Sequence, residues 1–335
     1  MSRMRGHSWL VFGVVVLLSG CANNVGSMVA ELEDRLAGVE LEDVPFHSQI
    51  TDQCGPAALA AVLNDVGIPV SPEELKHRVY IPERQGSLQL ELMAATRHFG
   101  RIPYEIDPNL GALVAELEAG RPILVLQNLG VTFAPIWHYA VVVGYLTTEQ
   151  QFVLRSGDKE RLLMRARSFT RSWRRGNYWA MVALKPGELP ANAIAERYLR
   201  SVAAIESTGN LANAIPAYRV ATERWPKSSL AWLGLGNASY AEGKLLEAGN
   251  AYGKSLEIKP NDAIALNNLS QVYLGLGCRD DALATINAAL SGVGATETVR
   301  SHLLLTQKEV KQSNAESQCL ELRSQSSLMR RSTSL

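Results

Sequence analysis

The sequence predicts an α+β domain followed by an all-α domain built from a helical repeat. Between residues 54 and 120 the apolar residues recur at helical spacing, whereas from residue 121 they gather into short β-branched or aromatic runs separated by turns. Beyond residue 195 the same residue types recur every 34 positions. The chain of 335 residues has room for about two domains of ordinary size.

Four helices are predicted in the first domain. The first runs from Cys54 to about Val66, with alanines that favour helix and an apolar stripe of Leu and Val. The second begins at Ser71 with the segment SPEE, a capping box with proline at the first helical position. The segments SLQLELMAATRHFG and NLGALVAELEAG are the third and the fourth.

Strands are predicted after these helices. The runs RPILVLQN, HYAVVVGYL, QFVLRS and YWAMVALKP are short, apolar and rich in residues that favour strands. Helices followed by neighbouring antiparallel strands are typical of an α+β domain.

The second domain repeats with a period of 34 residues. Positions that keep this step are Gly209, Gly243 and Gly277; Ala214, Ala248 and Ala282; Tyr218, Tyr252 and Ile286; Pro226 and Pro260; Trp232 and Leu266. The pattern resembles the tetratricopeptide repeat, and three units fit it, at 195–228, 229–262 and 263–296, with a capping helix starting near Ser301. The resemblance implies a concave groove for a protein partner; use as a structural buttress is the alternative.

The N-terminus has the order of an export signal. Arg3 and Arg5 precede the apolar run from Trp9 to Leu18, which is too short for a comfortable membrane span. The residues LSGC that end at Cys21 resemble a bacterial lipobox, which implies cleavage before Cys21, its acylation and a membrane tether. By resemblance to lipoprotein sorting, Ala22 then favours the outer membrane, facing the periplasm. The alternative is an ordinary signal peptide with a chance cysteine.

The composition gives no support for a nucleic-acid partner and leaves one disulfide undecided. Lys and Arg together equal Asp and Glu at 33 each, so the overall charge gives no reason to expect a nucleic-acid partner. Because an exported compartment is oxidising, Cys278 and Cys319 could pair, although the sequence alone does not decide it. No spacing of Cys and His resembles a zinc site.

Cys54 stands at the start of the first predicted helix, in QITDQCGPAALAAVL. Pro56 cannot lie deep in a helix, so the helix must begin close to Gly55. Unpaired amides and the macrodipole at a helix N-terminus favour the thiolate over the thiol. A glycine directly after the cysteine would leave room for substrate. Cys54 is therefore a candidate nucleophile; the alternative is a buried cysteine at a helix cap.

His138 is the candidate base for this nucleophile. It begins the apolar run HYAVVVGYL, where the run itself would favour another hydrophobic residue. A cysteine nucleophile on a first helix and a histidine on a later strand follow the order of papain-like enzymes. A structural histidine with satisfied hydrogen bonds is the alternative.

These segments resemble a known peptidase family. PFHSQITDQCGPAALAAVL, GSLQLELMAATRHFG and HYAVVVGY are similar to the papain-like cysteine peptidases that remove double-glycine leaders from bacteriocin precursors, over about 140 residues. The resemblance implies a papain-like fold with Cys54 as nucleophile and His138 as base. It also implies that the Gln49 side-chain amide and the Cys54 backbone amide form an oxyanion hole, with Gln53 as second choice for the glutamine.

The sequence departs from the family at the third catalytic residue. The family places Asp-Pro after the strand that follows the histidine, and here that strand ends in VLRSGD. Asp158 is the candidate that orients His138; Ser156 or an ordinary polar turn is the alternative. The chain also lacks the second long apolar run and the P-loop of the transporter-fused enzymes, so a role in bacteriocin export is not carried over.

Together these observations predict a membrane-anchored cysteine peptidase that needs no cofactor and acts on a peptide or an exported protein segment. The alternatives are an inactive peptidase-like scaffold of the cell envelope and an amidase of cell-wall peptides. The predicted parts are a signal peptide at 1–20, a tether at 21–43, an α+β papain-like domain at 44–186, a linker at 187–194, an all-α repeat domain at 195–312 and a tail at 313–335.

Overall fold

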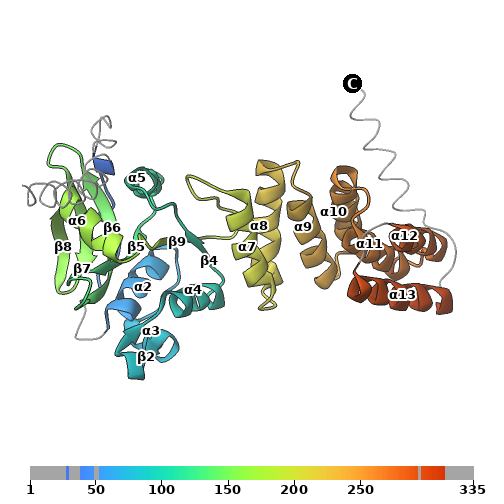
Figure 1. Ribbon diagram of the computed structural model, residues 1–335, viewed down its shortest axis with the longest axis horizontal. Helices are drawn as coiled ribbons and strands as arrows, with labels where there is room; N and C mark the ends of the chain where they lie inside the picture. Colours follow the sequence, from blue (N-terminus) through green and yellow to red (C-terminus); the bar gives the residue numbers. More distant parts are fainter. Residues whose placement is uncertain (1–27, 30–37, 49–52, 293–295, 314–335) are drawn as a thin grey trace, which may run out of the picture. The chain divides into compact units, whose positions relative to one another are not determined.

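The computed structural model describes residues 28–29, 38–48, 53–292 and 296–313. The chain divides into two compact units, each of which is described by itself (Figure 1). The sheet unit contains the described residues up to Lys185 together with Leu189–Ile194, and the repeat unit contains Pro186–Glu188 and the described residues from Ala195. No helix in the described ranges is long and apolar enough to cross a membrane.

The sheet unit is built on a seven-stranded sheet in which every described pair of strands is antiparallel. Its strands, in spatial order, are β4 (Ile102–Glu105), β9 (Ala180–Leu184), β5 (Ile123–Asn128), β6 (Trp137–Leu146), β7 (Gln151–Ser156) and β8 (Lys159–Arg165), with β1 (Val39–Glu40) paired to β6. A separate two-stranded sheet joins β2 (Tyr80–Ile81) to β3 (Gly86–Ser87), with the 3₁₀ turn Pro82–Arg84 between them.

Helices pack on both faces of the large sheet. On one face α2 (Cys54–Asp65), α3 (Pro72–Val79) and α4 (Gln89–His98) share a core with Tyr139 and Val141 of β6. On the other face α6 (Ala166–Arg175) stacks its Phe169 and Trp173 rings beside Phe152 of β7. The helix α5 (Leu110–Glu118) contacts β5 and β6.

The predicted α+β class and its four helices are confirmed, and so are the four predicted strands. The second helix carries both hydrogen bonds of the predicted capping box between Ser71 and Glu74. The sequence did not reveal β4, β8 or α6. Arginines dominate α6, so only Ala166, Phe169 and Trp173 form its apolar stripe, at spacing i, i+3 and i+7.

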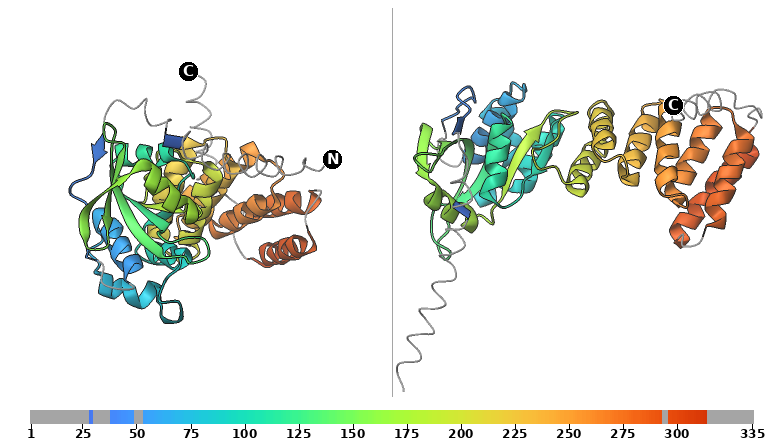
Figure 2. Two further views of the ribbon diagram at one scale, coloured as in Figure 1. Left: turned by 60° about the vertical axis from the view of Figure 1, so that its left-hand side comes forward. Right: turned by 90° about the horizontal axis from the view of Figure 1, so that it is seen from above.

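The repeat unit consists of helix pairs followed by one further helix (Figure 2). The pairs are α7 (Ala195–Glu206) with α8 (Leu211–Arg224), α9 (Ser229–Ala241) with α10 (Leu245–Ile258), and α11 (Ala263–Gly275) with α12 (Arg279–Ser291); α13 (Glu297–Gln312) follows. Gly209, Gly243 and Gly277 end the first helix of each pair with φ of 78, 77 and 80°. This left-handed conformation favours glycine, which explains why glycine recurs at that step of 34 residues.

Small residues allow neighbouring helices, both within a pair and between consecutive pairs, to approach each other closely, as the repeat predicts. A Cβ atom added to Gly234 would lie 2.2 Å from the ring of Tyr218, and one added to Gly236 would lie 2.5 Å from the ring of Tyr252. Ala248 in the second helix of its pair is fully buried. The Cys278 thiol is disulfide-bonded, and Cys319, the partner considered from the sequence, lies outside the described residues.

Candidate active site

Cys54 is the first residue of α2, as the sequence predicts. Gln53 precedes the helix with φ −108° and ψ 16° and provides no side-chain cap. Its carbonyl accepts the first hydrogen bond of the helix from Ala57 N at 3.0 Å. Pro56 has no N–H, so it is tolerated in this first turn. Cys54 therefore lies at the positive end of the helix, and its thiol is not part of a disulfide.

Residue 55 must be glycine because strand β3 lies against it, and not because a side chain there would take the place of substrate. A Cβ atom at this position would lie 2.5 Å from Ser87 Oγ and 2.7 Å from Ser87 Cβ, in β3. The expectation that the glycine leaves room for substrate is therefore wrong, because Ser87 already occupies that space. The turn from β2 to β3 forms a wall beside Cys54.

His138 is the second residue of β6 and is half-buried. Its Nε2 atom lies 2.8 Å from Ser156 Oγ, at the end of β7. Burial lowers the pKa of the His138 imidazole below its ordinary value of 6.5. The ring is therefore neutral at pH 7, a state in which its second nitrogen can accept a proton.

Asp158 lies away from the imidazole in the structure. Strand β7 ends at Ser156, Gly157 turns the chain with φ 61°, and β8 begins at Lys159. Asp158 therefore sits in the turn, where its side chain is 75% exposed and its carboxylate lies 3.0 Å from Lys159 Nζ. A hydrogen bond from Lys159 lowers the pKa of Asp158. The structure brings Ser156, rather than the predicted Asp158, to the ring nitrogen.

Cys54 and His138 line one cavity of about 830 Å³. The remaining lining comes from the turn and helix start at residues 84–89 and from Leu126, Trp137, Tyr139, Gly157 and Asn177. The volume lies in the range of pockets that bind small molecules or peptide segments. The cavity is thus lined by a thiol and an imidazole together with other polar and apolar groups.

Tyr139 is a site residue that the sequence did not reveal. Its hydroxyl donates a hydrogen bond to the Ser87 carbonyl at 3.2 Å and so ties β6 to the wall beside Cys54. Burial raises the pKa of Tyr139, and the nearby Cys54 and Glu91 charges raise it further. The phenol therefore stays protonated, and its position directly after His138 in an apolar strand was the available signal.

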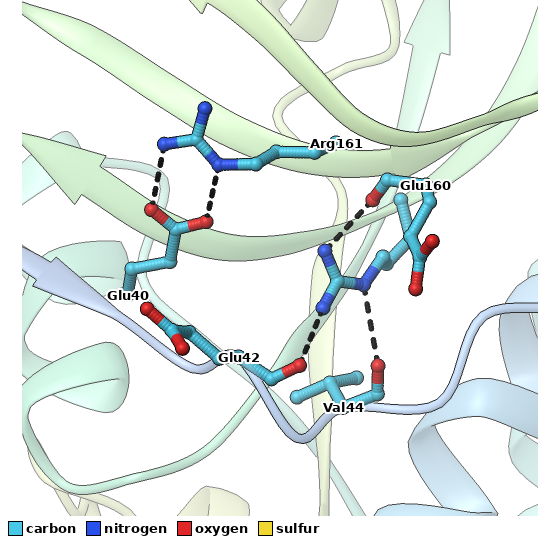
Figure 3. A network of polar contacts seen from close by, with 6 residues as sticks. Glu40, Glu42, Val44, Glu160 and Arg161 are labelled. Atoms are coloured by element: carbon cyan, nitrogen blue, oxygen red, sulfur yellow. Dashed lines mark hydrogen bonds and ion pairs between the residues drawn. The ribbon is translucent and has the colours of Figure 1, made fainter.

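The segment that leads to Cys54 is held by β7 and α2. Arg155, a buried residue of β7, donates hydrogen bonds to the carbonyl oxygens of Val44 at 3.2 Å and Glu42 at 2.8 Å (Figure 3). Closer to the cysteine, His47 Nε2 lies 2.8 Å from Asn64 Oδ1 of α2. Because Arg155 precedes Ser156, the end of one strand positions both this segment and the imidazole.

Two predicted site residues lie outside the described residues: Gln49, the oxyanion-hole candidate, and Cys21, the lipidation candidate. Gln53, the second choice for the oxyanion hole, is described and is half-buried at the start of α2. Within the described ranges there is no group of three or more His, Cys, Asp or Glu side chains that could hold a metal ion.

Comparison with known proteins assigns both units. Residues 41–180 match the Peptidase_C39 like family, and residues 236–277 match a TPR repeat. Among solved structures, the chain is similar to a C39-like peptidase from Bacillus anthracis at 18% identity and a TM-score of 0.37, over 44% of this chain and 98% of that one. It is also similar to the Sgt2 TPR domain from Aspergillus fumigatus at 15% identity and a TM-score of 0.32, over 37% of this chain and 84% of that one.

No curated protein matches the chain. The family matches agree with the resemblance read from the sequence and with the two architectures described above. Residues 41–180 are a Peptidase_C39-like domain, and the helices that follow it contain a tetratricopeptide repeat.

Proposed function

We propose that the C39-like domain is a cysteine peptidase, with Cys54 as nucleophile and His138 as general base. The observation that carries the proposal is the shared cavity: one residue at a helix N-terminus and one at the start of a strand, far apart in sequence, line the same 830 Å³ space. The hydrogen bond between His138 Nε2 and Ser156 Oγ supports it, because it fixes the imidazole in one orientation, and with Nε2–H as the donor the second ring nitrogen stays available as the base.

The proposed reaction is acyl transfer to sulfur followed by hydrolysis. The Cys54 sulfur attacks the peptide carbonyl carbon while His138 takes the thiol proton. The Gln49 amide and the Cys54 backbone amide stabilise the oxyanion. The C–N bond breaks as His138 returns the proton to the leaving amine. Water then attacks the thioester carbon and gives its proton to His138; the C–S bond breaks, the carboxylic acid product leaves, and His138 returns the proton to the Cys54 sulfur, so no cofactor is needed.

Ser156, the residue that holds His138, distinguishes this site from a cysteine peptidase site in which an aspartate holds the histidine. A serine hydroxyl can hold the ring by a hydrogen bond but carries no charge to stabilise an imidazolium. The proposed enzyme therefore depends on a neutral histidine and is slower than one with an aspartate at this position. The same observation favours the second candidate function, an inactive peptidase-like scaffold that binds peptide in the cavity.

The other proposed properties come from the sequence at both ends. The LSGC segment ending at Cys21 supports a lipid anchor, and hence a place at the outer membrane of a bacterial envelope, facing the periplasm. The TPR repeat supports binding of a protein partner, in a groove that delivers substrate or assembles a complex. The proposed substrate is a peptide or an exported protein segment.

Peptide-library digestion tests the peptidase proposal. The chain is incubated with unstructured peptides, and new termini are identified by mass spectrometry. We expect products with the wild type and none with Cys54→Ala or His138→Ala. Ser156→Ala should reduce the rate by roughly fivefold to tenfold, the worth of one hydrogen bond, and Asp158→Ala should not change it. Equal cleavage by wild type and Cys54→Ala would exclude the peptidase; no cleavage with tight binding of peptides in the cavity would establish the scaffold.

A further inference from the structure

The loop between β5 and β6 is an ordered hairpin with an uncovered apolar face. Leu129 N donates to the Ile136 carbonyl at 2.8 Å, and Val131 and Ala134 exchange two backbone hydrogen bonds of 3.2 and 3.1 Å. Asn128 Oδ1 accepts hydrogen bonds from Gly130 N and Ile136 N and so closes the base. The hairpin continues the pairing of β5 with β6 beyond the end of the large sheet.

The register of this hairpin places its apolar residues on one face. Residues opposite each other in an antiparallel pair share a face, and so do residues two apart along a strand. Leu129 and Val131 therefore lie on the same face as Ile136, and this face continues the side of the sheet that carries Gln127. Leu129 is 45% exposed, Val131 48% and Ile136 62%.

Phe133 is the most exposed large hydrophobic side chain in the described ranges, at 92%, and it occupies the turn at the tip of the hairpin. At this exposure the Phe133 ring makes little contact with its own domain, so it is available to insert into apolar surroundings. Such a tip fits a deformable apolar medium, as at the acyl boundary of a bilayer, where aromatic residues are enriched.

A basic helix lies next to this hairpin. Gln127 donates to Ser172 Oγ of α6 at 2.7 Å, so α6 covers the face of the sheet that the apolar face of the hairpin continues. The C-terminal end of α6 meets the hairpin base, where Arg175 donates to the Asn128 carbonyl at 3.1 and 2.8 Å.

The outer face of α6 is basic, and two of its arginines have no acidic partner in the part of the chain that the structure describes. Arg167 and Arg171 are exposed, and their guanidinium groups form no ion pair among the described residues. From Arg161 to Lys185 the sequence has six arginines, one lysine and no aspartate or glutamate, although the whole chain is neutral. The positive charge is therefore concentrated beside the apolar hairpin.

We propose that the hairpin at residues 129–136 and the outer face of α6 dock the C39-like domain onto an anionic lipid surface. Apolar and aromatic side chains that insert beside arginines that bind headgroups are the pattern of interfacial membrane binding. Within the expected tether at residues 21–43, Val29 is already buried in the domain, and the stretch from Cys21 to Met28 would span at most about 25 Å when extended, so a chain anchored at Cys21 keeps the domain close to the bilayer.

Docking has a consequence for substrate choice that rests on the proposed peptidase activity. Trp137, at the base of the hairpin, also lines the cavity that holds Cys54 and His138. A docked domain therefore opens its cavity close to the lipid surface. The substrates it meets are peptide segments that lie at the membrane rather than peptides free in solution.

Vesicle sedimentation tests the docking with residues 22–335, which lack the acylation site and retain every residue that the structure describes. We expect binding to vesicles of phosphatidylcholine with phosphatidylglycerol, weakened by salt, and much weaker binding to phosphatidylcholine alone. The pair Arg167→Glu and Arg171→Glu should reduce binding by about 25-fold or more, at about fivefold for each lost cation. The pair Val131→Ser and Phe133→Ser should reduce it by about tenfold.

Matched changes in the repeat unit provide the controls. Lys227→Glu with Lys308→Glu reverses two exposed charges, and Leu230→Ser with Leu305→Ser removes two exposed leucines, of 62% and 64% exposure. Neither pair should alter binding. Circular dichroism checks folding, and Phe133→Trp gives a second measurement: its fluorescence should shift to the blue with anionic vesicles and be quenched by brominated lipid.

Three results would overturn the proposal. The first is equal binding to both kinds of vesicle, and the second is wild-type binding by the α6 pair. The third is binding to soluble polyglutamate that depends on Arg167 and Arg171 without binding to vesicles, which would assign the basic face to an acidic protein. Loss of peptide cleavage bears on the peptidase proposal alone, because vesicle binding is measured without substrate.

Discussion

Glycines at helix ends recur at a fixed step in the repeat unit but not in the sheet unit, and the difference shows what a sequence can disclose. In the repeat unit one solution recurs: Gly209 and Gly243 adopt nearly the same left-handed φ at equivalent helix ends. In the sheet unit Gly67 and Gly120 also follow helix ends with φ of 82 and 75°, but they recur at no fixed step, and other glycines are required by a single neighbour, Gly55 by Ser87 and Gly176 by the carbonyl of Leu126. A requirement that recurs is visible as a period in the sequence, whereas a requirement that occurs once is visible only when its neighbour is known.

The largest expected effect on folding lies in the sheet unit. Trp173 is fully buried, stacks on Phe169 and donates its Nε1–H to the Trp179 carbonyl at 3.0 Å. Trp173→Ala should lower the free energy of unfolding of this unit by about 3–5 kcal/mol, because a large cavity and a broken hydrogen bond result. Urea unfolding followed by near-UV circular dichroism measures it.

The control for Trp173→Ala is Trp232→Ala in the repeat unit, where the indole is half-buried. Trp232→Ala should lower the free energy of unfolding of the repeat unit by less than Trp173→Ala lowers that of the sheet unit. If Trp173→Ala leaves the transition of the sheet unit in place, the packing of α6 on β7 is not as described.

A smaller effect is expected from overpacking the repeat unit. Gly234→Ala places a Cβ atom 2.2 Å from the Tyr218 ring, so the two helices must separate, at a cost of about 1–3 kcal/mol. Gly253→Ala is the matched control, because its Cβ would meet no atom within 4 Å and alanine favours helix by up to about 1 kcal/mol. Thermal unfolding should move in opposite directions for the two variants; equal shifts would contradict the close approach at Gly234.

The smallest change concerns charge at the site. Ser156→Asp puts a carboxylate where Ser156 Oγ now lies 2.8 Å from His138 Nε2. An adjacent negative charge favours the protonated ring, so the pKa of His138 should rise by about 1–3 units from its lowered value. NMR titration in a Cys54→Ala background measures this shift, and His138→Gln identifies the resonance. Asp158→Asn should leave it in place; an unchanged titration in Ser156→Asp would show that Ser156 does not contact the ring.

Much of the fold could be predicted from the sequence, for reasons that are local. Pro56 restricts where α2 can begin, and the Ser71 capping box marks the start of α3, so both boundaries follow from backbone chemistry. The repeat unit follows from its period. The helix α6 was not predicted, because its arginines leave only a narrow apolar stripe. Its burial also depends on contacts with β5 and β7, which are not visible in its own sequence pattern.

The residue that orients His138 was the least predictable part of the site. The candidates Ser156 and Asp158 are two residues apart, and the choice between them depends on where β7 ends. The pairing of β7 with β8 shifts register between Leu154 and Ser156, and Gly157 then turns the chain, so Asp158 is carried into solvent. Such a bulge has no signal in the apolar pattern. The walls formed by Ser87 and Tyr139 depend on tertiary contacts and were likewise hidden.

The most direct test of the central claim is the alkylation rate of Cys54 across pH, measured by mass spectrometry after iodoacetamide treatment of the wild type and His138→Ala. A plain thiol reacts with a pKa of about 8.5. Because burial lowers the pKa of His138, the ring remains a base below pH 6.5, and Cys54 should react rapidly down to that pH and lose this reactivity in His138→Ala. Slow labelling that follows an ordinary thiol, with no response to His138, would contradict a nucleophile–base pair and leave a peptide-binding scaffold.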